Sequence, residues 1–190
     1  MQHASSLFTL SDNGIQLEPI NYNTPPTLSY GTCLTPFGLC CIVHDNSIIL
    51  HLSFCEQSAE HTHFHEIQTL FPNNILEHDE TRTQLLCEQI FFHRHHNVPV
   101  RSILRGSAFQ ITVWKQLLQI PYGTTCSYQA IAQQLHVPLA TRAVAHAIAR
   151  NNIAYIIPCH RVIGTDNKLR GYRWGIERKK LMLQHENAIL

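Results

Sequence analysis

The sequence predicts an α/β chain of the α+β kind: a small N-terminal α/β domain followed by a mainly helical C-terminal domain. Two runs of β character, residues 39–43 and 48–52, lie early and are separated by a polar link. From Gly106 onward the apolar residues recur at helical spacing. The charge divides at the same place, because residues 101–190 hold 12 Lys and Arg against 3 Asp and Glu, and residues 1–100 hold 2 against 10. We therefore expect two domains.

Composition narrows the possible classes. The 190 residues are 44% hydrophobic with a formal charge of +1, which suits an ordinary core. No apolar run is long enough to span a membrane, and the first ten residues lack a signal-peptide pattern. Seven cysteines without zinc-ribbon or Cys-x-x-Cys spacing predict free thiols and a reducing, cytoplasmic compartment. The basic C-terminal half indicates a polyanionic partner; chance clustering of solvated charges is the alternative.

The N-terminal half is expected to begin with a poorly ordered extension, residues 1–27, followed by the α/β domain, residues 28–98. Residues 36–38 predict a turn, and residues 44–47 predict the turn of a hairpin. Helices are expected over residues 58–71, with Ser58 as the N-cap, and over 80–93.

Histidines are frequent in this half. One group alternates (His61, His63, His65) and another clusters (His93, His95, His96). Alternating residues spread around a helix rather than share one face, so we predict no metal site here.

Residues 99–105 are expected to link the domains, and 106–190 to form the second one. Ser107 and Gln110 have the spacing of a capping box, which predicts a helix to about residue 119. Ser127 should cap a helix over 128–135. Further helices are expected over 138–150, ended by Asn151 and Asn152 in a left-handed conformation, and over 176–187. The predicted buried stripe of the first helix is Phe109, Val113, Trp114, Leu117 and Leu118.

The helices at 128–135 and 138–150 form a helix-turn-helix pattern. The second has Val144, Ile148 and Ala147 on its predicted buried face. Its outer side is mostly alanine with one Arg142, so it lacks the polar side chains that read bases in the major groove. Alanines allow close approach to a minor groove, although alanine is also simply a good helix former. The alanines on that side are Ala140, Ala143, Ala145 and Ala147.

A candidate nucleophile follows a short apolar run. Residues 153–157 predict a buried strand, which Pro158 ends. Cys159 and His160 come next, and a thiol beside an imidazole is typical of an activated nucleophile with its base. The alternative is a buried structural cysteine.

The sequence Pro158-Cys159-His160-Arg161-Val162 resembles the active-site signature of the O6-alkylguanine-DNA alkyltransferases. The resemblance runs from Gly106 to Glu186, is most similar to the C-terminal half of the bacterial adaptive-response protein, and continues weakly back to Leu28. The other matching motifs are Ser127-Tyr128-Gln129, Thr141-Arg142-Ala143-Val144, Asn151, Gly171-Tyr172 and Glu186.

The resemblance implies DNA repair by an enzyme that acts once. The methyl group of O6-methylguanine, and also that of O4-methylthymine, would pass from double-stranded DNA to Cys159 itself, without a cofactor. The base would flip out of the duplex, and the protein would act as a monomer away from membranes. The structural zinc of some family members does not map onto Cys33, Cys40 or Cys41, so no metal is expected.

The resemblance also assigns roles. His160 would take the proton of Cys159 through a water, and Glu186 would orient His160. Asn151 would brace the turn around the nucleophile, Tyr128 would act at N3 of the base, and Arg142 would fill the space that the base vacates. The expected base- and DNA-binding set is completed by Val162, Tyr172, Arg173, Ala143, Ala145 and Trp114.

Three departures from the family pattern bear on the substrate. Trp174 stands where some members have glycine, and Ile153 and Ala154 stand near positions where others have proline. We therefore expect methyl transfer with restricted tolerance for bulky groups.

Three other functions compete with this interpretation. A regulatory helix-turn-helix protein would need polar base readers, and a non-catalytic lesion binder would lack Cys159. A cysteine hydrolase would need an oxyanion hole.

Overall fold

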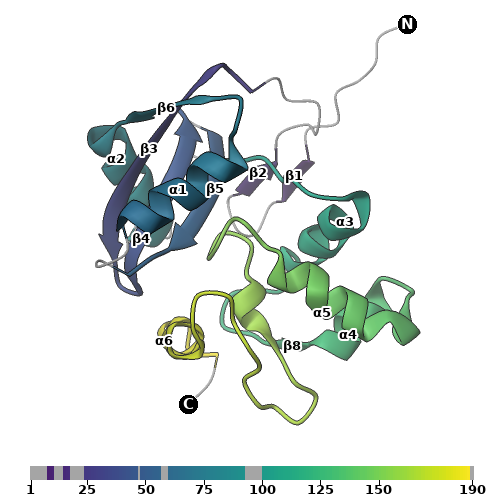
Figure 1. The fold of residues 1–190 in the computed structure, drawn as a ribbon. Helices are drawn as coiled ribbons and strands as arrows, with labels where there is room; N and C mark the ends of the chain where they lie inside the picture. Colours follow the sequence, from purple (N-terminus) through teal and green to yellow (C-terminus); the bar gives the residue numbers. More distant parts are fainter. Residues whose placement is uncertain are drawn as a thin grey trace, which may run out of the picture. The chain divides into compact units, whose positions relative to one another are not determined.

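The computed structural model describes residues 8–10, 15–17, 24–46, 48–56, 60–92 and 100–188 (Figure 1). The chain divides into two compact units, residues 1–104 and 105–190. The division falls at the end of the stretch predicted as a linker. The first unit is built on a sheet and the second is mainly helical, which confirms the predicted α+β class.

A seven-stranded mixed sheet forms the first unit, in the order β1-β2-β7-β5-β4-β3-β6. The β3–β4, β4–β5 and β1–β2 pairs are antiparallel, whereas β7 pairs in parallel with β2 and β5, and β6 with β3. The strands are β1 (Phe8–Leu10), β2 (Ile15–Leu17), β3 (Thr27–Thr35), β4 (Gly38–Asp45), β5 (Ile48–Phe54), β6 (Ile75–His78) and β7 (Val100–Ser102).

The predicted hairpin of β4 and β5 is confirmed, as is the turn before β4, where Gly38 has a φ of 108° that favours glycine. The sequence did not predict β3 or β6. It also did not predict β1, β2 or β7, which have three residues each, too few to show alternation. Strands β1 and β2 lie within the predicted extension, whose residues 1–7, 11–14 and 18–23 lie outside the described residues, and β7 lies within the predicted linker.

Helices α1 (Glu60–Leu70) and α2 (Glu80–Phe91) cover opposite faces of the sheet. Ile67 of α1 packs in a core with Cys41 and Val43. On the other face, the Oγ1 atom of Thr83 in α2 lies 3.2 Å from Nε2 of His44. The predicted N-cap Ser58 lies outside the described residues, as do His93, His95, His96 and the side chains of His61 and His63.

The described part of the second unit, residues 105–188, contains four α-helices: α3 (Ala108–Leu117), α4 (Tyr128–Gln134), α5 (Thr141–Ala149) and α6 (Ile176–His185). The capping box of Ser107 and Gln110 and the Ser127 cap are confirmed. Helices α4 and α5 form the helix-turn-helix pattern, with the 3₁₀ turn η2 (Pro138–Ala140) leading into α5. A second 3₁₀ turn, η3 (Cys159–Arg161), precedes β9 (Val162–Ile163), which pairs in parallel with β8 (Cys126–Ser127).

The core of this unit lies between α3, α4 and α5. Val113, Trp114, Leu117 and Leu118 are buried as predicted, but Phe109 is 40% exposed. Phe109 lies in the first turn of α3, so we attribute its exposure to the end of the helix extending past the core. Val144, Ala147 and Ile148 form the buried face of α5, which removes Ala147 from the predicted outer side.

The prediction of a strand over residues 153–157 is wrong, because this stretch is a series of turns. The Ile157 N–H donates to the Ile153 carbonyl at 3.2 Å, and Tyr155 takes a left-handed φ of 64°. Its residues are apolar because they are enclosed, with Ile153 and Ala154 fully buried. Helix α5 ends without the predicted left-handed asparagine, since neither Asn151 nor Asn152 is among the described residues with a positive φ.

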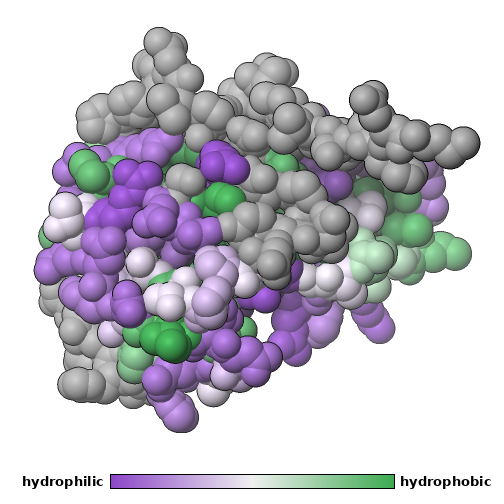
Figure 2. Space-filling view, turned by 90° about the horizontal axis from the view of Figure 1, so that it is seen from above, coloured by the Kyte–Doolittle hydropathy of each residue, from purple (hydrophilic) through white to green (hydrophobic). Residues whose placement is uncertain are grey.

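In the described residues, no helix combines the length and the apolar character that a membrane span requires. The face in Figure 2 agrees with this, since its coloured surface is largely hydrophilic with separate small hydrophobic patches.

Candidate active site

Cys159 lies in the 3₁₀ turn between the enclosed loop and β9, and it is 4% exposed. The Asn151 side chain holds this turn in place. Its Nδ2 donates to the carbonyls of Ile153 and Ile157, each at 3.2 Å, and reaches Sγ of Cys159 at 3.1 Å. Its Oδ1 accepts from the Ile153 N–H at 2.9 Å. One buried amide therefore fixes the loop and the thiol together.

Burial raises the pKa of the Cys159 thiol, against the opposing effects of the Asn151 hydrogen bond and the nearby Lys179 charge. The resting side chain is therefore a thiol at neutral pH, and the reaction needs a base.

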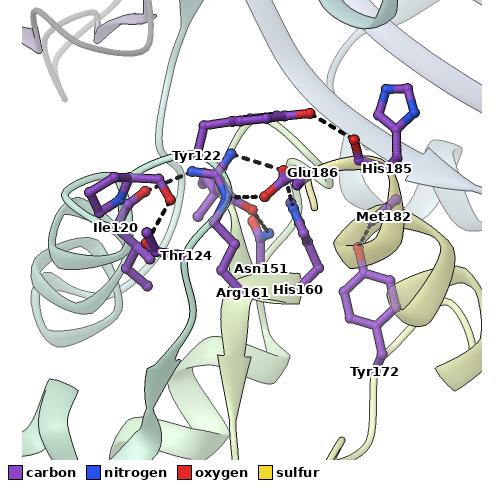
Figure 3. Close-up of polar contacts among 12 residues, drawn as sticks. Ile120, Tyr122, Thr124, Asn151, His160, Arg161, Tyr172, Met182, His185 and Glu186 are labelled. Carbon is purple, nitrogen blue, oxygen red and sulfur yellow. Dashed lines mark hydrogen bonds and ion pairs between the residues drawn. The ribbon is translucent and has the colours of Figure 1, made fainter. Parts of the chain in front are cut away.

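A buried polar network joins His160, the residue after Cys159, to Arg161 and Glu186 (Figure 3). Nε2 of His160 is 2.9 Å from Oε1 of Glu186, which caps the C-terminus of α6. Arg161 donates to both oxygens of the same carboxylate, from Nε at 2.8 Å and from an Nη atom at 3.0 Å. All three side chains are almost completely buried. The Glu186 carboxylate thus binds the His160 ring and, in a bidentate pair, the Arg161 guanidinium.

The network determines which nitrogen of His160 can accept a proton. Burial alone would raise the pKa of Glu186, but the hydrogen bonds from His160 and Arg161 lower it to about 2, so the carboxylate is ionised and only accepts. Burial lowers the pKa of His160, so the ring is neutral and must carry its proton on Nε2. Its Nδ1 is buried without a hydrogen-bond partner in the described chain. That atom is therefore available as a base.

The segment after α3 holds the network in position. Arg161 donates from Nη1 to the Ile120 carbonyl at 2.7 Å and lies over the Tyr122 ring at 5.5 Å. The Tyr122 hydroxyl donates to the His185 carbonyl at 3.1 Å, beside Glu186 (Figure 3). Sequence reasoning missed these contributions of Arg161 and Tyr122, because only tertiary contacts reveal them.

Lys179 of α6 is a second residue that the sequence did not single out. It is fully buried, and its Nζ donates to the Val162 carbonyl at 2.5 Å and lies 3.4 Å from the Arg170 carbonyl. Burial lowers its pKa to about 8, opposed by the charge of the Cys159 thiolate. A cation at this place would stabilise that thiolate.

A pocket of about 560 Å³ opens onto the nucleophile. Cys159 is the one cysteine in its wall. Arg142, Arg170 and Arg173 also line it, and no acidic residue does, so the pocket suits an anionic ligand. The remaining lining residues are Tyr128, Thr141, Ala145, Ile148, Ala149, Gly171, Tyr172 and Trp174.

Both tyrosines in the pocket keep their protons at neutral pH. Burial raises the pKa of Tyr128, and the charge of Cys159 adds to the effect. Burial raises the pKa of Tyr172 further, and its hydroxyl lies 3.6 Å from Sδ of Met182. The Tyr172 hydroxyl donates to that sulfur, whereas the Tyr128 phenol can donate a hydrogen bond to a base in the pocket.

The structure brings together most of the predicted site, with exceptions. The prediction that Trp114 binds DNA is wrong, because it is 1% exposed and its Nε1 donates to the Ala147 carbonyl at 2.9 Å inside the core. Val162 is fully buried and outside the pocket wall, and Ala143 is exposed on α5 but also outside it. Ile153 and Ala154 do not line the pocket either.

Comparison with known proteins places these residues in context. Residues 108–188 match the family model described as "6-O-methylguanine DNA methyltransferase, DNA binding domain". A methylated-DNA–protein-cysteine methyltransferase of Mycobacterium bovis is 39% identical over 163 residues, which is 85% of this chain and 93% of the relative. The "bifunctional transcriptional activator/DNA repair enzyme Ada" of Escherichia coli is 53% identical over 83 residues, 44% of this chain and 23% of that protein.

A solved structure is similar over most of the chain. The Mycobacterium tuberculosis OGT in complex with DNA aligns with a TM-score of 0.67 and 37% identity, covering 84% of this chain and 92% of that one. The O6-methylguanine-DNA methyltransferase of Pyrococcus kodakaraensis aligns with a TM-score of 0.61 at 20% identity, so that it supports the fold alone.

Proposed function

This chain belongs to the methylated-DNA–protein-cysteine methyltransferase family, and we propose on that premise that Cys159 is the residue that accepts the alkyl group. The protein repairs DNA by taking the alkyl group of O6-methylguanine onto a cysteine of its own. The observation that carries the assignment of Cys159 is its position: a thiol held by Asn151 in the wall of a pocket rich in arginine, beside a histidine with a vacant ring nitrogen.

His160 activates the nucleophile. Its vacant Nδ1 takes the proton of Cys159 through a bridging water, and the Glu186 carboxylate stabilises the imidazolium that results. The Asn151 hydrogen bond and the Lys179 ammonium stabilise the thiolate. Cys159, His160 and Glu186 thus act as a nucleophile, its general base and the carboxylate that orients the base.

The transfer itself is a direct displacement at the methyl carbon. The Cys159 sulfur forms the new S–C bond as the bond between O6 and that carbon breaks, and the guanine leaves with the electron pair. The proton that left the thiol returns to the guanine, so no oxidant, reductant or cofactor takes part. The thioether that remains has no good leaving group, so each molecule acts once.

Tyr128 assists the departing base. Its phenol keeps its proton because its pKa is raised, and it lines the same pocket as Cys159. A hydrogen bond from this hydroxyl to N3 would stabilise the negative charge that develops on the guanine ring. Tyr172 would contribute to the wall of the pocket that holds the base.

The lesion reaches Cys159 by base flipping. A buried thiol cannot approach O6 inside a stacked duplex, so the nucleotide must turn out into the pocket. Arg142 is exposed on α5 at the pocket wall, where its planar guanidinium can occupy the vacated stack. The small Ala143 and Ala145 on α5 permit close approach to the minor groove.

Three further properties complete the proposed function: the oligomeric state, the cellular compartment and a second substrate. One chain supplies every group of the site, so the protein acts as a monomer on DNA. A nucleophile that must be reduced, together with six further cysteines that form no disulfide bond, suits the cytoplasm. O4-methylthymine is proposed as a second substrate.

Intact-mass spectrometry tests the assignment. The protein is incubated with a duplex that contains one O6-methylguanine, beside Cys159→Ala and the control Cys126→Ser. One added methylene per chain in the parent and the control, and none in Cys159→Ala, supports the proposal. A gain that persists in Cys159→Ala would mean that another cysteine is the acceptor, and binding without any gain would indicate a lesion-binding protein.

A further inference from the structure

Three cysteines meet in the first unit, where alkyl transfer makes no use of them. Cys33 and Cys40 have their sulfur atoms 3.2 Å apart, and the sulfur atoms of Cys33, Cys40 and Cys87 all lie within 4.8 Å of one another. Exposure is 4% for Cys33 and zero for the other two. We call these residues the three-cysteine cluster.

The fold explains why these side chains meet. Cys33 of β3 and Cys40 of β4 are direct partners in an antiparallel pair, so they point to the same face of the sheet. Helix α2 covers that face and contributes Cys87 from its buried side. Phe91, one turn further along α2, packs edge-on against Phe37 and Phe54, with its ring centroid 6.1 and 6.2 Å from theirs. The cluster is therefore enclosed beside aromatic side chains.

The thiols interact as a unit. Hydrogen bonds from Cys33 and Cys40 lower the pKa of Cys87 to about 4, whereas hydrogen bonding and burial raise the pKa of Cys40. In the described chain no fourth His, Cys, Asp or Glu ligand atom joins the group. The cluster offers three sulfur ligands and nothing else.

Ligand number and charge select the ion. Structural zinc sites are almost always four-coordinate, which three sulfurs do not satisfy. Three thiolates carry three negative charges, so Cu⁺ would leave a buried charge of −2, and burying unpaired charge is costly. A trivalent ion with three sulfur ligands leaves the site neutral. Trivalent arsenic forms such pyramidal tris-thiolates.

We propose that the three-cysteine cluster binds a trivalent thiophile of the arsenite class, with Cys33, Cys40 and Cys87 as its three ligands. Arsenite, As(OH)₃, exchanges three As–O bonds for three As–S bonds. The three thiol protons leave with the three hydroxyls as three waters, and no electron is transferred. Cys33 and Cys40 lie two residues from the ends of the β3–β4 turn, so opening of this turn would admit the ligand.

Binding would join the hairpin to α2 and so stabilise the folded chain. Cys159 offers a single thiol with Asn151 and Tyr172 beside it, so it cannot provide a three-sulfur site. The prediction therefore separates the cluster from the alkyl acceptor.

The test uses the full chain, reduced with a phosphine and titrated with arsenite. Native mass spectrometry should show one arsenic in place of three hydrogens per chain, and X-ray absorption should show three sulfur neighbours. Cys33→Ser, Cys40→Ser and Cys87→Ser should each lose this adduct. The matched controls Cys55→Ser, also buried in the first unit, and Cys159→Ser should keep it.

Circular dichroism checks that each variant folds. If a serine variant does not fold, the sulfur count in the parent decides the matter. Fewer than three sulfur neighbours, an adduct that survives all three substitutions, or an adduct lost only in Cys159→Ser would overturn the proposal. Stoichiometric Zn²⁺ that arsenite cannot displace would overturn it as well.

Discussion

Nε2 of His160 lies 2.9 Å from a Glu186 oxygen, and the opposite ring nitrogen has no hydrogen-bond partner in the part of the chain described. Since Glu186 is ionised, this contact fixes the tautomer that leaves Nδ1 unprotonated. The residue next to the nucleophile is thus held ready to accept a proton. Two predictions test this relationship from different sides.

The first prediction concerns the pH dependence of methyl transfer. The pKa of His160 is lowered below its usual 6.5, so the parent's rate should be nearly constant above neutral pH and fall in acid. In His160→Gln the thiolate forms only by loss to solvent, and burial raises the pKa of Cys159. We expect this variant to lose roughly 10²-fold or more at pH 7 and to recover as pH rises.

Single-turnover transfer from an O6-methylguanine duplex, measured from pH 5 to 9, gives both profiles. His136→Gln, an exposed histidine on the turn after α4, is the matched control and should follow the parent. A flat profile for His160→Gln would show that His160 is not the base.

The second prediction concerns stability in acid. The Glu186 carboxyl is more acidic in the folded chain, with a pKa of about 2, than in the unfolded chain at 4.5. Its ionisation therefore stabilises the folded state above pH 4.5, by about 3 kcal/mol, and this contribution is lost as pH falls from about 4.5 to 2. Glu186→Gln should cost a few kcal/mol at pH 7 because it leaves Arg161 buried without its carboxylate.

Urea unfolding from pH 7 down to pH 2 measures the difference between parent and variant, which should shrink across the acid range. Asp166→Asn removes an exposed pair with Arg170 and should change the free energy of unfolding by less than about 1 kcal/mol. A pH-independent difference for Glu186→Gln would contradict the assignment.

The third prediction separates base flipping from chemistry. Arg142→Ala should slow repair of a duplex by about 10²-fold, because nothing fills the space that the flipped base leaves. It should scarcely affect reaction with free O6-methylguanine base, which needs no flipping. Arg150→Ala, at the exposed C-cap of α5 and outside the pocket wall, is the control for general charge loss. Equal losses on duplex and free base would argue against the role.

The sequence correctly predicted the helix starts and the hairpin, which are determined by residues close together in the chain. The caps at Ser107 and Ser127 and the hairpin over 39–52 follow from neighbouring residues, and the structure confirms them. Tertiary contacts decide the rest. The loop over 153–157 has the composition of a buried strand, but the Asn151 side chain satisfies its backbone in a turn conformation. No local pattern distinguishes those two outcomes.

The same reason explains the site residues that the sequence missed. Arg161 stands in the recognised signature, yet its bond to the Ile120 carbonyl joins segments 41 residues apart. Lys179 looks like one of several charges on α6, and only burial against the Val162 carbonyl distinguishes it. Trp114 shows the opposite error, because its position in a helix stripe was already sufficient to place it in the core.

The last prediction concerns the size of the alkyl group. Trp174 is 8% exposed, lines the pocket and packs edge-on against Tyr172 with ring centroids 5.2 Å apart. Because its indole forms part of the pocket wall, removing it should enlarge the pocket, and Trp174→Gly should raise the rate with O6-benzylguanine at least about tenfold relative to O6-methylguanine. The ratio of the two rates is the measurement, since it cancels any general loss of activity. Trp114→Phe, in the core, is the matched aromatic control and should leave the ratio unchanged. An unchanged ratio in Trp174→Gly would mean that other walls of the pocket set the size limit.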